Sequence, residues 1–395
     1  MQRDISNKML LAFLVIFTNI VPPLSVDEYT PSIPHMLAPL HTTAAMMQLT
    51  VTVYMLAFAV SQMICGPLSD SFGRRKILLF NLPIYFIGTL ICIFAHSGFV
   101  LILGRVIQGL GVGALALTGP AVMSDCFKGK ELLRISARYS TIYSFIIISA
   151  PVIGGFIQQW LDWQGNFVFM FVLGVIIFAT FYFLFPETHP VEKRHHLSMK
   201  NIRKSYFAVL TNKKYMAAVI CLVLTWTMLV VFSVMAPFLI QNKLHFSPAQ
   251  YGLLALLVGV GFFVGNTINN FLLKIFLPVK IMLWGFFIML AMSLIQTVLP
   301  LLGFFNIYTV MLPVCIMMAG AGLGFGYLYG SAASAVPQYA GTAGALIGSL
   351  ILIGAVIITA LITQLEARSP IDMAAVFLVL SLMCLAIYRF MFEEA

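Results

Sequence analysis

The chain has 395 residues, of which 61% are hydrophobic and 9% are charged, and its mean hydropathy is +1.01. Soluble globular proteins have roughly 45–50% apolar and about 25% charged residues, so this composition excludes an ordinary soluble enzyme, a disordered chain and a nucleic-acid-binding module. Twelve membrane-spanning helices of about 20 residues require about 240 residues. The chain is therefore long enough for such a bundle without a large soluble domain.

The hydropathy pattern predicts an all-α membrane protein with twelve transmembrane helices. The predicted segments are 9–29, 44–68, 77–95, 98–123, 135–158, 164–186, 215–240, 250–272, 279–300, 306–331, 340–364 and 371–392. Most connections are short, which requires neighbouring helices to run antiparallel. The exception is the Lys- and Arg-rich segment 189–214. It predicts two six-helix bundles, 1–188 and 215–395, joined by a linker.

The distribution of Lys and Arg predicts that both termini and the linker are cytoplasmic. In this orientation all but three of the 22 Lys and Arg residues lie in cytoplasmic segments. Lys243 and Arg368 lie on the other side, and Arg105 lies inside a predicted helix. The net charge of +9 is therefore a topology signal. It requires no nucleic-acid partner, although it is compatible with contacts to anionic lipid.

The sequence shows no pattern of a metal site, a disulfide framework or a catalytic cluster. The six Cys lie inside or at the ends of apolar runs without a CxxC pair, and the His residues have no metal-ligand spacing. We therefore expect neither a metal nor an enzymatic activity.

Ionisable groups are rare within the predicted helices, and such groups usually face a cavity or one another. Asp27 and Glu28 lie near the outer end of the first helix, and Arg105 lies in the fourth. A carboxylate that shares a wet cavity with Arg105 is suited to binding and releasing a proton. Alternatively, both carboxylates are solvated at the membrane interface, an interpretation that fits Glu28 better than Asp27. Pro22 and Pro23 predict a kink in the first helix.

The loop after the second helix combines helix-breaking and charged residues. Gly66 and Pro67 are expected to end the helix, and Gly73 permits a tight turn. Asp70 and Arg74 are close enough to pair, with Asp125 at the end of the fourth helix as a third member. Such a cluster is suited to latching helices in one conformation. Physical reasoning alone equally allows a solvated loop that sets topology.

Four segments resemble motifs of the major facilitator superfamily. Residues 66–75, GPLSDSFGRR, are similar to its G-x-L-a-D-r-x-G-r-r/k loop, and residues 105–111, RVIQGLG, to its R-x-x-Q-G-x-G motif. Residues 149–155, SAPVIGG, resemble the antiporter motif G-P-x-x-G-G, with Ala150 in place of Gly. Residues 27–34, DEYTPSIP, are similar to the D-M-Y-L-P-x-x-P segment of twelve-helix drug:proton antiporters of the Bcr/CflA type.

The resemblance implies two bundles around a central cavity and rocker-switch alternating access. Proton entry would drive the export of a small organic molecule across a bacterial inner membrane. It implies that Asp27, with Glu28 as the next candidate, couples protons together with Arg105. It further implies that Asp70, Arg74 and Asp125 form a cytoplasmic latch. Pro151, Gly154 and Gly155 would form the antiporter motif.

Polar and aromatic residues on otherwise apolar helices are candidates for lining the substrate cavity. They are Asn19, Tyr54, Gln108, Tyr143, Trp226, Asn266 and Tyr327. Asn19 stands where some multidrug members have a Glu that recognises cationic drugs, and this departure weakens the assignment of a cationic substrate.

The predicted function is a proton-coupled exporter of a drug or metabolite. It would act as a monomer, with no cofactor other than the proton gradient and with substrate, protons and membrane lipid as partners. A carboxylate-rich metabolite or siderophore, exported or imported, is the alternative substrate class. A non-transporting membrane receptor is the alternative of another kind, but no sensor domain is evident in the sequence.

Overall fold

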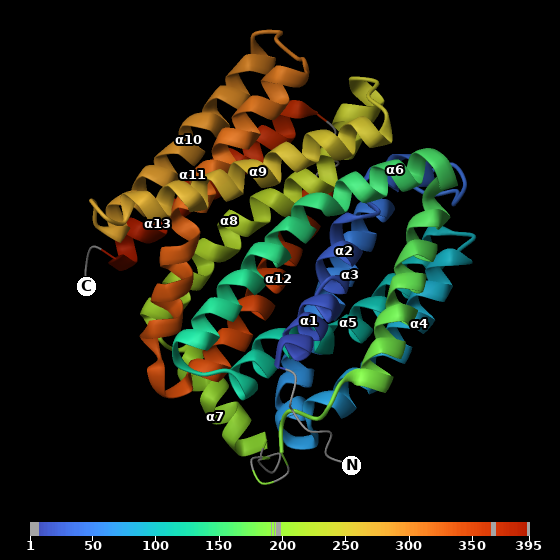
Figure 1. The fold of residues 1–395 in the computed structure, drawn as a ribbon. Coiled ribbons are helices and arrows are strands. Elements are labelled where there is room, and N and C mark those ends of the chain that lie inside the picture. The colour runs from blue at the N-terminus through green and yellow to red at the C-terminus, as the bar shows by residue number, and fades with distance from the viewer. Residues whose placement is uncertain (1–7, 191, 193, 195–198, 365–368, 393–395) are drawn as a thin grey trace. The chain divides into compact units, whose positions relative to one another are not determined.

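The structure is a computed structural model that describes residues 8–190, 192, 194, 199–364 and 369–392. The chain divides into two compact units, Met1–Ile202 and Arg203–Ala395, and the division falls inside the segment predicted as the linker. All regular secondary structure in the described residues is helical (Figure 1). Arg3, Lys193 and Arg368, which enter the predicted orientation, lie outside the described residues.

Among its described residues, the first unit contains six α-helices and one named 3₁₀-helix, and a further helix crosses its boundary with the second unit. In chain order these are α1 (Lys8–Thr18), α2 (Val21–Asp27), η1 (Thr30–Met36), α3 (Ala44–Phe72), α4 (Arg74–Ile93), α5 (Gly98–Cys126), α6 (Gly129–Leu184) and the boundary helix α7 (Met199–Leu210).

The second unit is also helical throughout its described residues. Its elements are α8 (Lys213–Pro237), the π-helical η3 (Phe238–Lys243), α9 (Pro248–Leu272), α10 (Pro278–Leu301), α11 (Ile307–Ala335), the 3₁₀-helix η4 (Pro337–Tyr339), α12 (Ala340–Gln364) and α13 (Pro370–Phe392).

The first predicted transmembrane helix is not continuous. Residues 9–29 form α1 and α2 with a break after Thr18, and the chain then enters η1. Pro22 lies among the first residues of α2, where a missing backbone N–H costs little because the first N–H groups of a helix have no partner. The predicted kink is therefore a full break before the prolines. It leaves Asp27 and Glu28 at the junction of α2 and η1.

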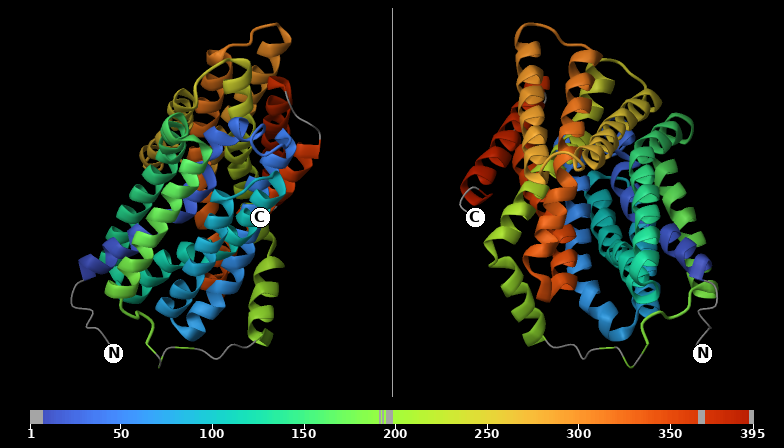
Figure 2. Two further views of the ribbon diagram at one scale, coloured as in Figure 1. Left: turned by 90° about the vertical axis from the view of Figure 1, so that its right-hand side faces the viewer. Right: turned by 60° about the vertical axis from the view of Figure 1, so that its left-hand side comes forward.

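One predicted helix end differs from the structure. Helix α3 continues through Gly66 and Pro67 to Phe72 and ends at Gly73. The predicted segments 135–158 and 164–186 are two helical arms within α6, because the backbone is non-helical at Asp162, where φ is +59°, and the chain reverses there. Figure 2 shows the two arms of α6 (green) on either side of this reversal.

Ten helices among the described residues are long and apolar enough to cross a membrane. One of them, Ile142–Leu184, has 43 residues. A straight helix of that length is about 65 Å long, about twice the thickness of a bilayer core. The bent stretch thus has the length of two spans, whereas α1 and α2 are each too short for one. The count of twelve spans and the cytoplasmic termini stay predictions.

The helices of the first unit approach one another through glycines, as is common where the surrounding solvent is lipid. On α5, Gly109 packs on the backbone of Tyr54 in α3, and Gly111 packs on the backbone of Tyr85 in α4. Gly88 of α4 in turn packs on the backbone of Gln108. These contacts leave no room for a Cβ atom, so α5 lies unusually close to both neighbours.

In the second unit, the neighbours of α11 also pack closely against it at glycines. Gly320 packs on Gly285 and Ile288 of α10, and Gly322 packs on the backbone of Phe262 and Asn266 in α9. The closely spaced glycines of α11 are therefore a packing feature.

The predicted linker contains a helix that the sequence analysis missed. In α7, Lys200, Arg203, Lys204 and Phe207 are exposed, whereas Val209 is buried. Its apolar residues recur at helical spacing, but only 12 residues are involved, which is too short for a span.

Gly111→Ala is expected to destabilise the protein, whereas Gly330→Ala is not. A Cβ atom at position 111 meets the backbone of Tyr85, and one at position 330 of α11 meets nothing within 4 Å. Overpacking typically costs about 1–3 kcal/mol, while Ala in place of Gly inside a helix gains up to about 1 kcal/mol. Melting temperatures of the purified, detergent-solubilised variants measure the difference. Equal melting temperatures would show that α4 and α5 are not tightly packed.

Candidate functional site

Arg105 of α5 is completely buried in the first unit. One guanidinium nitrogen donates to the Oε1 atom of Gln108 at 2.6 Å, and another donates to the backbone carbonyl of Ser25 in α2 at 2.8 Å. Arginine is a donor only and remains charged in proteins. Among the described residues no carboxylate forms an ion pair with it, so carbonyl and amide dipoles supply its direct hydrogen bonds.

Two aromatic rings complete the surroundings of the cation. The Arg105 guanidinium carbon lies 4.4 Å from the ring centroid of Tyr29 and 4.0 Å from that of Tyr54. The Tyr29 hydroxyl is hydrogen-bonded to Thr50 of α3 at 2.8 Å. A desolvated cation–π contact is worth about 2 kcal/mol. Helices α2, α3 and α5 thus jointly stabilise one buried positive charge.

Glu28 is also fully buried, and neither carboxyl oxygen has a hydrogen-bond partner among the described residues. The charge that acts on it is that of Arg105. The interpretation of Glu28 as a solvated interfacial residue is therefore wrong. Asp27 is half-buried and acts electrostatically on Tyr143 of α6. The two adjacent carboxylates consequently have different surroundings.

The segment that resembles the antiporter motif packs on this junction. Gly154 of α6 lies directly against the backbone carbonyl of Glu28, leaving no room for a side chain. Pro151 and Gly155 are buried in the same turns of α6. The Asn166 amide further along α6 donates to the Ser32 hydroxyl of η1 at 2.6 Å. Helix α6 therefore contacts the chain at Glu28 and again four residues later at Ser32.

The candidate cavity residues of the first unit form two groups. Tyr54 and Gln108 surround Arg105. Asn19 accepts a hydrogen bond from the Tyr139 hydroxyl at 2.9 Å, and the Tyr139 ring stacks on Tyr143 with centroids 5.8 Å apart. This second group connects the end of α1 with α6.

The candidates of the second unit lie on α8, α9 and α11. The ring of Trp226 contacts Phe325, which contacts Phe262 edge-on. Asn266 is exposed on α9, and Tyr327 is partly buried on α11. A cavity lined from both halves of the chain stays a prediction.

The three residues of the predicted latch are in contact in the structure. Arg74 is buried at the start of α4 and forms ion pairs with Asp70 at the end of α3 and with Asp125 at the end of α5. Its distance to Asp125 is 3.1 Å, and it also donates to the Ser69 hydroxyl at 2.8 Å. One guanidinium thus joins the ends of α3, α4 and α5. Its role as a conformational latch stays a prediction.

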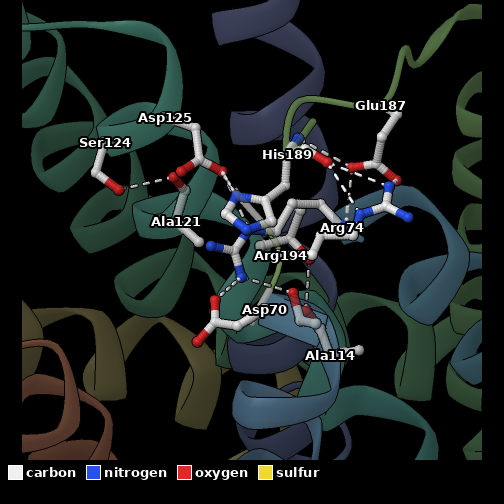
Figure 3. A network of polar contacts seen from close by, with 11 residues as sticks. Asp70, Arg74, Ala114, Ala121, Ser124, Asp125, Glu187, His189 and Arg194 are labelled. Carbon is white, nitrogen blue, oxygen red and sulfur yellow. Dashed lines mark hydrogen bonds and ion pairs between the residues drawn. The ribbon is translucent and has the colours of Figure 1, made fainter. Parts of the chain in front are cut away.

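The segment after α6 extends this network, as Figure 3 shows. Glu187 accepts a hydrogen bond from the Arg74 backbone N–H at 2.9 Å and pairs with Arg194 at 3.5 Å. His189 lies 3.8 Å from Asp125. Gly73 has a φ of +101°, and a Cβ there would meet Glu187 and Arg194. Both the backbone angle and the crowding therefore require glycine at the turn.

Sequence reasoning missed several of these partners. Glu187, His189 and Arg194 lie more than 100 residues from Arg74, and no local spacing connects them to it. Ser25 and Thr89, whose hydroxyl accepts from the Gln108 amide, are ordinary small polar residues of apolar helices, so no sequence pattern distinguishes them. Tyr29 lies in the D-E-Y-T-P segment, whose resemblance does not point to a contact with Arg105.

Sequence comparison matches residues 9–359 to the Major Facilitator Superfamily. An uncharacterized transporter of Rickettsia bellii (strain RML369-C) is 28% identical over 390 residues, which cover 95% of each chain. Multidrug resistance protein D of Escherichia coli (strain K12) is 26% identical, covering 92% of this chain and 90% of the relative. Multidrug resistance protein MdtL of Escherichia coli O157:H7 is 24% identical, covering 82% and 81%.

The fold is also similar to that of a solved structure. The xylose transporter XylE from E. coli, in a partially occluded inward-open conformation, aligns with a TM-score of 0.76 over 98% of this chain and 97% of the other. The sequences are 12% identical, so this similarity concerns the fold alone.

Asp125→Asn is expected to destabilise the protein more than Asp70→Asn. Both carboxylates pair with Arg74, but the Asp125 side chain is 18% exposed and that of Asp70 is 53% exposed. Loss of an exposed partner costs at most about 1 kcal/mol, whereas loss of the more buried, less screened partner removes a charged hydrogen bond and is expected to cost roughly 2 kcal/mol. Melting temperatures measure both. Equal shifts would contradict the assignment of Asp125 as the dominant partner.

Proposed function

The chain belongs to the major facilitator superfamily, and on that premise we propose that it is a proton-coupled exporter of a small organic molecule. It is a membrane-spanning transporter by family and fold. Relatives named as multidrug resistance proteins support a drug or metabolite as substrate. We extend the proposal to the inner membrane of a bacterium, to a monomer, and to the proton gradient as the energy source without a cofactor.

The observation that best supports proton coupling is the buried pair of Glu28 and Arg105. A buried carboxyl group without a hydrogen-bond partner, close to a permanent cation, has a charge state that depends closely on its surroundings. Glu28 lies at the junction of α2 and η1, within the discontinuous first span, and transporters commonly build ion sites at such discontinuous helices. Intramembrane ionisable residues are in general functional candidates.

In the proposed cycle, Glu28 takes up a proton from the outer side and releases it to the cytoplasm while the substrate moves outward. Arg105 remains charged and stabilises the deprotonated carboxylate. Gly154 transmits movement of α6 to Glu28, because it packs directly on the Glu28 backbone. The ion pairs of Arg74 with Asp70 and Asp125 would hold the ends of α3, α4 and α5 together in one conformation. These ion pairs would break in the other conformation.

The sequence alone favoured Asp27 as the proton carrier, whereas burial favours Glu28. Asp27 is half-buried beside Tyr143, and Glu28 is completely enclosed near the cation. We therefore propose Glu28 as the main carrier and Asp27 as a group that assists exchange with water.

A carboxylate-bearing substrate has less support than a neutral or cationic one. Such a substrate requires a free cation, but the Arg105 guanidinium already binds Gln108, the Ser25 carbonyl and two aromatic rings.

Inverted membrane vesicles with an imposed pH gradient test the proposed function. The probes are ethidium, a cation, and carboxyfluorescein, a carboxylate. The proposal expects ethidium to accumulate only while the gradient is present and a protonophore to abolish the accumulation. Gradient-independent movement would contradict proton coupling, and accumulation confined to right-side-out vesicles would indicate import.

Glu28→Gln is expected to reduce gradient-driven ethidium transport at least about tenfold, a loss equivalent to about 1.4 kcal/mol or more, because the amide cannot exchange a proton. Asp27→Asn, the matched control one residue away, should retain measurable gradient-driven transport. Initial rates in proteoliposomes measure both variants, with melting temperature as the check on folding. Wild-type rates for Glu28→Gln, or complete loss in Asp27→Asn alone, would transfer the role to Asp27.

A further inference from the structure

The polar contacts of Arg105 close into a ring of five buried residues on three helices. The members of this Arg105 ring are Ser25 of α2, Tyr85 and Thr89 of α4, and Arg105 and Gln108 of α5, and each is 0% exposed. The Gln108 Nε2 donates to the Thr89 hydroxyl at 3.0 Å, and that hydroxyl donates to the Tyr85 carbonyl at 2.7 Å. The Tyr85 hydroxyl is hydrogen-bonded to the Ser25 hydroxyl at 2.9 Å.

The directions of the Gln108 and Thr89 hydrogen bonds follow from Arg105. Because arginine only donates, Gln108 must present its Oε1 atom to the guanidinium, so its NH₂ group must point to α4. There the Thr89 hydroxyl accepts from the amide and gives its own proton to the Tyr85 carbonyl. The Thr89 hydroxyl therefore satisfies the Gln108 amide in the orientation that Arg105 requires.

Without this hydroxyl, Gln108 loses its oriented acceptor. The remaining contact of Nε2 is the Met170 sulfur at 3.9 Å, which is a weak acceptor. An amide that flips would direct NH₂ at the guanidinium and place donor against donor. The guanidinium would then lose one of its two hydrogen bonds and its fixed position beside Tyr29 and Tyr54.

We propose that Thr89 is a positioning residue that holds the Arg105 guanidinium through Gln108, and that it thereby sets the response of Glu28 to pH. The proposal rests on the proposed role of Glu28 in proton coupling. Thr89 belongs to none of the four motif-like segments. Its hydroxyl reaches Gln108 because the adjacent Gly88 packs on the Gln108 backbone.

Several titratable groups other than Glu28 and Arg105 lie near the ring and must be considered in a pH measurement. They are Asp27, Tyr29, Tyr54 on α3, Tyr85 and Cys92 on α4, and Tyr143 on α6. A Glu28→Gln background separates the contribution of Glu28 from theirs.

The pair Thr89→Val and Thr89→Ser tests the proposal. Valine keeps the branched shape and removes the hydroxyl, whereas serine keeps the hydroxyl. In proteoliposomes, Thr89→Val should slow ethidium transport by about threefold to tenfold, the range expected for one lost hydrogen bond. It should also shift the midpoint of the pH–rate profile by about half a pH unit or more. Thr89→Ser should retain the wild-type midpoint.

A second measurement needs no substrate: the pH dependence of the melting temperature of purified protein. Thr89→Val should change this dependence, Thr89→Ser should not, and the change should vanish in the Glu28→Gln background. The proposal would be overturned if the melting temperatures of Thr89→Val and Thr89→Ser had the same pH dependence. A shift of melting temperature that is the same at every pH would also overturn it. If wild-type protein transports neither probe, the proposed function fails, and the melting measurement still decides the role of Thr89.

Discussion

The first unit is organised around a permanent positive charge that is completely buried. Arg105 cannot become neutral, and an unpaired charge in an apolar interior is costly. The protein meets this cost with a backbone carbonyl, one amide and two aromatic rings, contributed by the segment after the break in the first span and by α3 and α5. Arg105 therefore does not depend on an ion pair with Glu28. Glu28 can gain or lose a proton without removing a hydrogen bond from Arg105.

This arrangement depends on close helix packing. The 3.0 Å hydrogen bond from the Gln108 amide of α5 to the short Thr89 side chain of α4 requires the two backbones to lie close together. Gly88, Gly109 and Gly111 allow that approach, and Gly154 repeats it between α6 and Glu28. The buried polar contacts therefore depend on these glycines, because small residues bring the helices close enough for polar groups to meet.

The sequence predicted the features that are local or repeated in a family. Apolar segments predicted the all-α membrane class. The motif spacing marked Asp70, Arg74 and Arg105, and the position of Asp125 at the end of the fourth predicted helix added it to the cluster. It could not predict that Glu28 is more buried than Asp27, because adjacent residues differ only through the break and the packing of α6. The contacts of Thr89 with Gln108 and of Glu187 with Arg74 could not be predicted, because the partners are distant in sequence. The extension of α3 past Gly66 and Pro67 reflects tertiary packing that overrides local helix-ending signals.

The central claim is that Glu28, beside Arg105, binds and releases a proton within the membrane interior. Infrared difference spectroscopy of reconstituted protein, between acidic and alkaline buffer, observes protonated carboxyl groups directly. The account predicts a titrating carboxyl band that is present in wild type and in Asp27→Asn and absent in Glu28→Gln. A band that persists in Glu28→Gln and disappears in Asp27→Asn would contradict it.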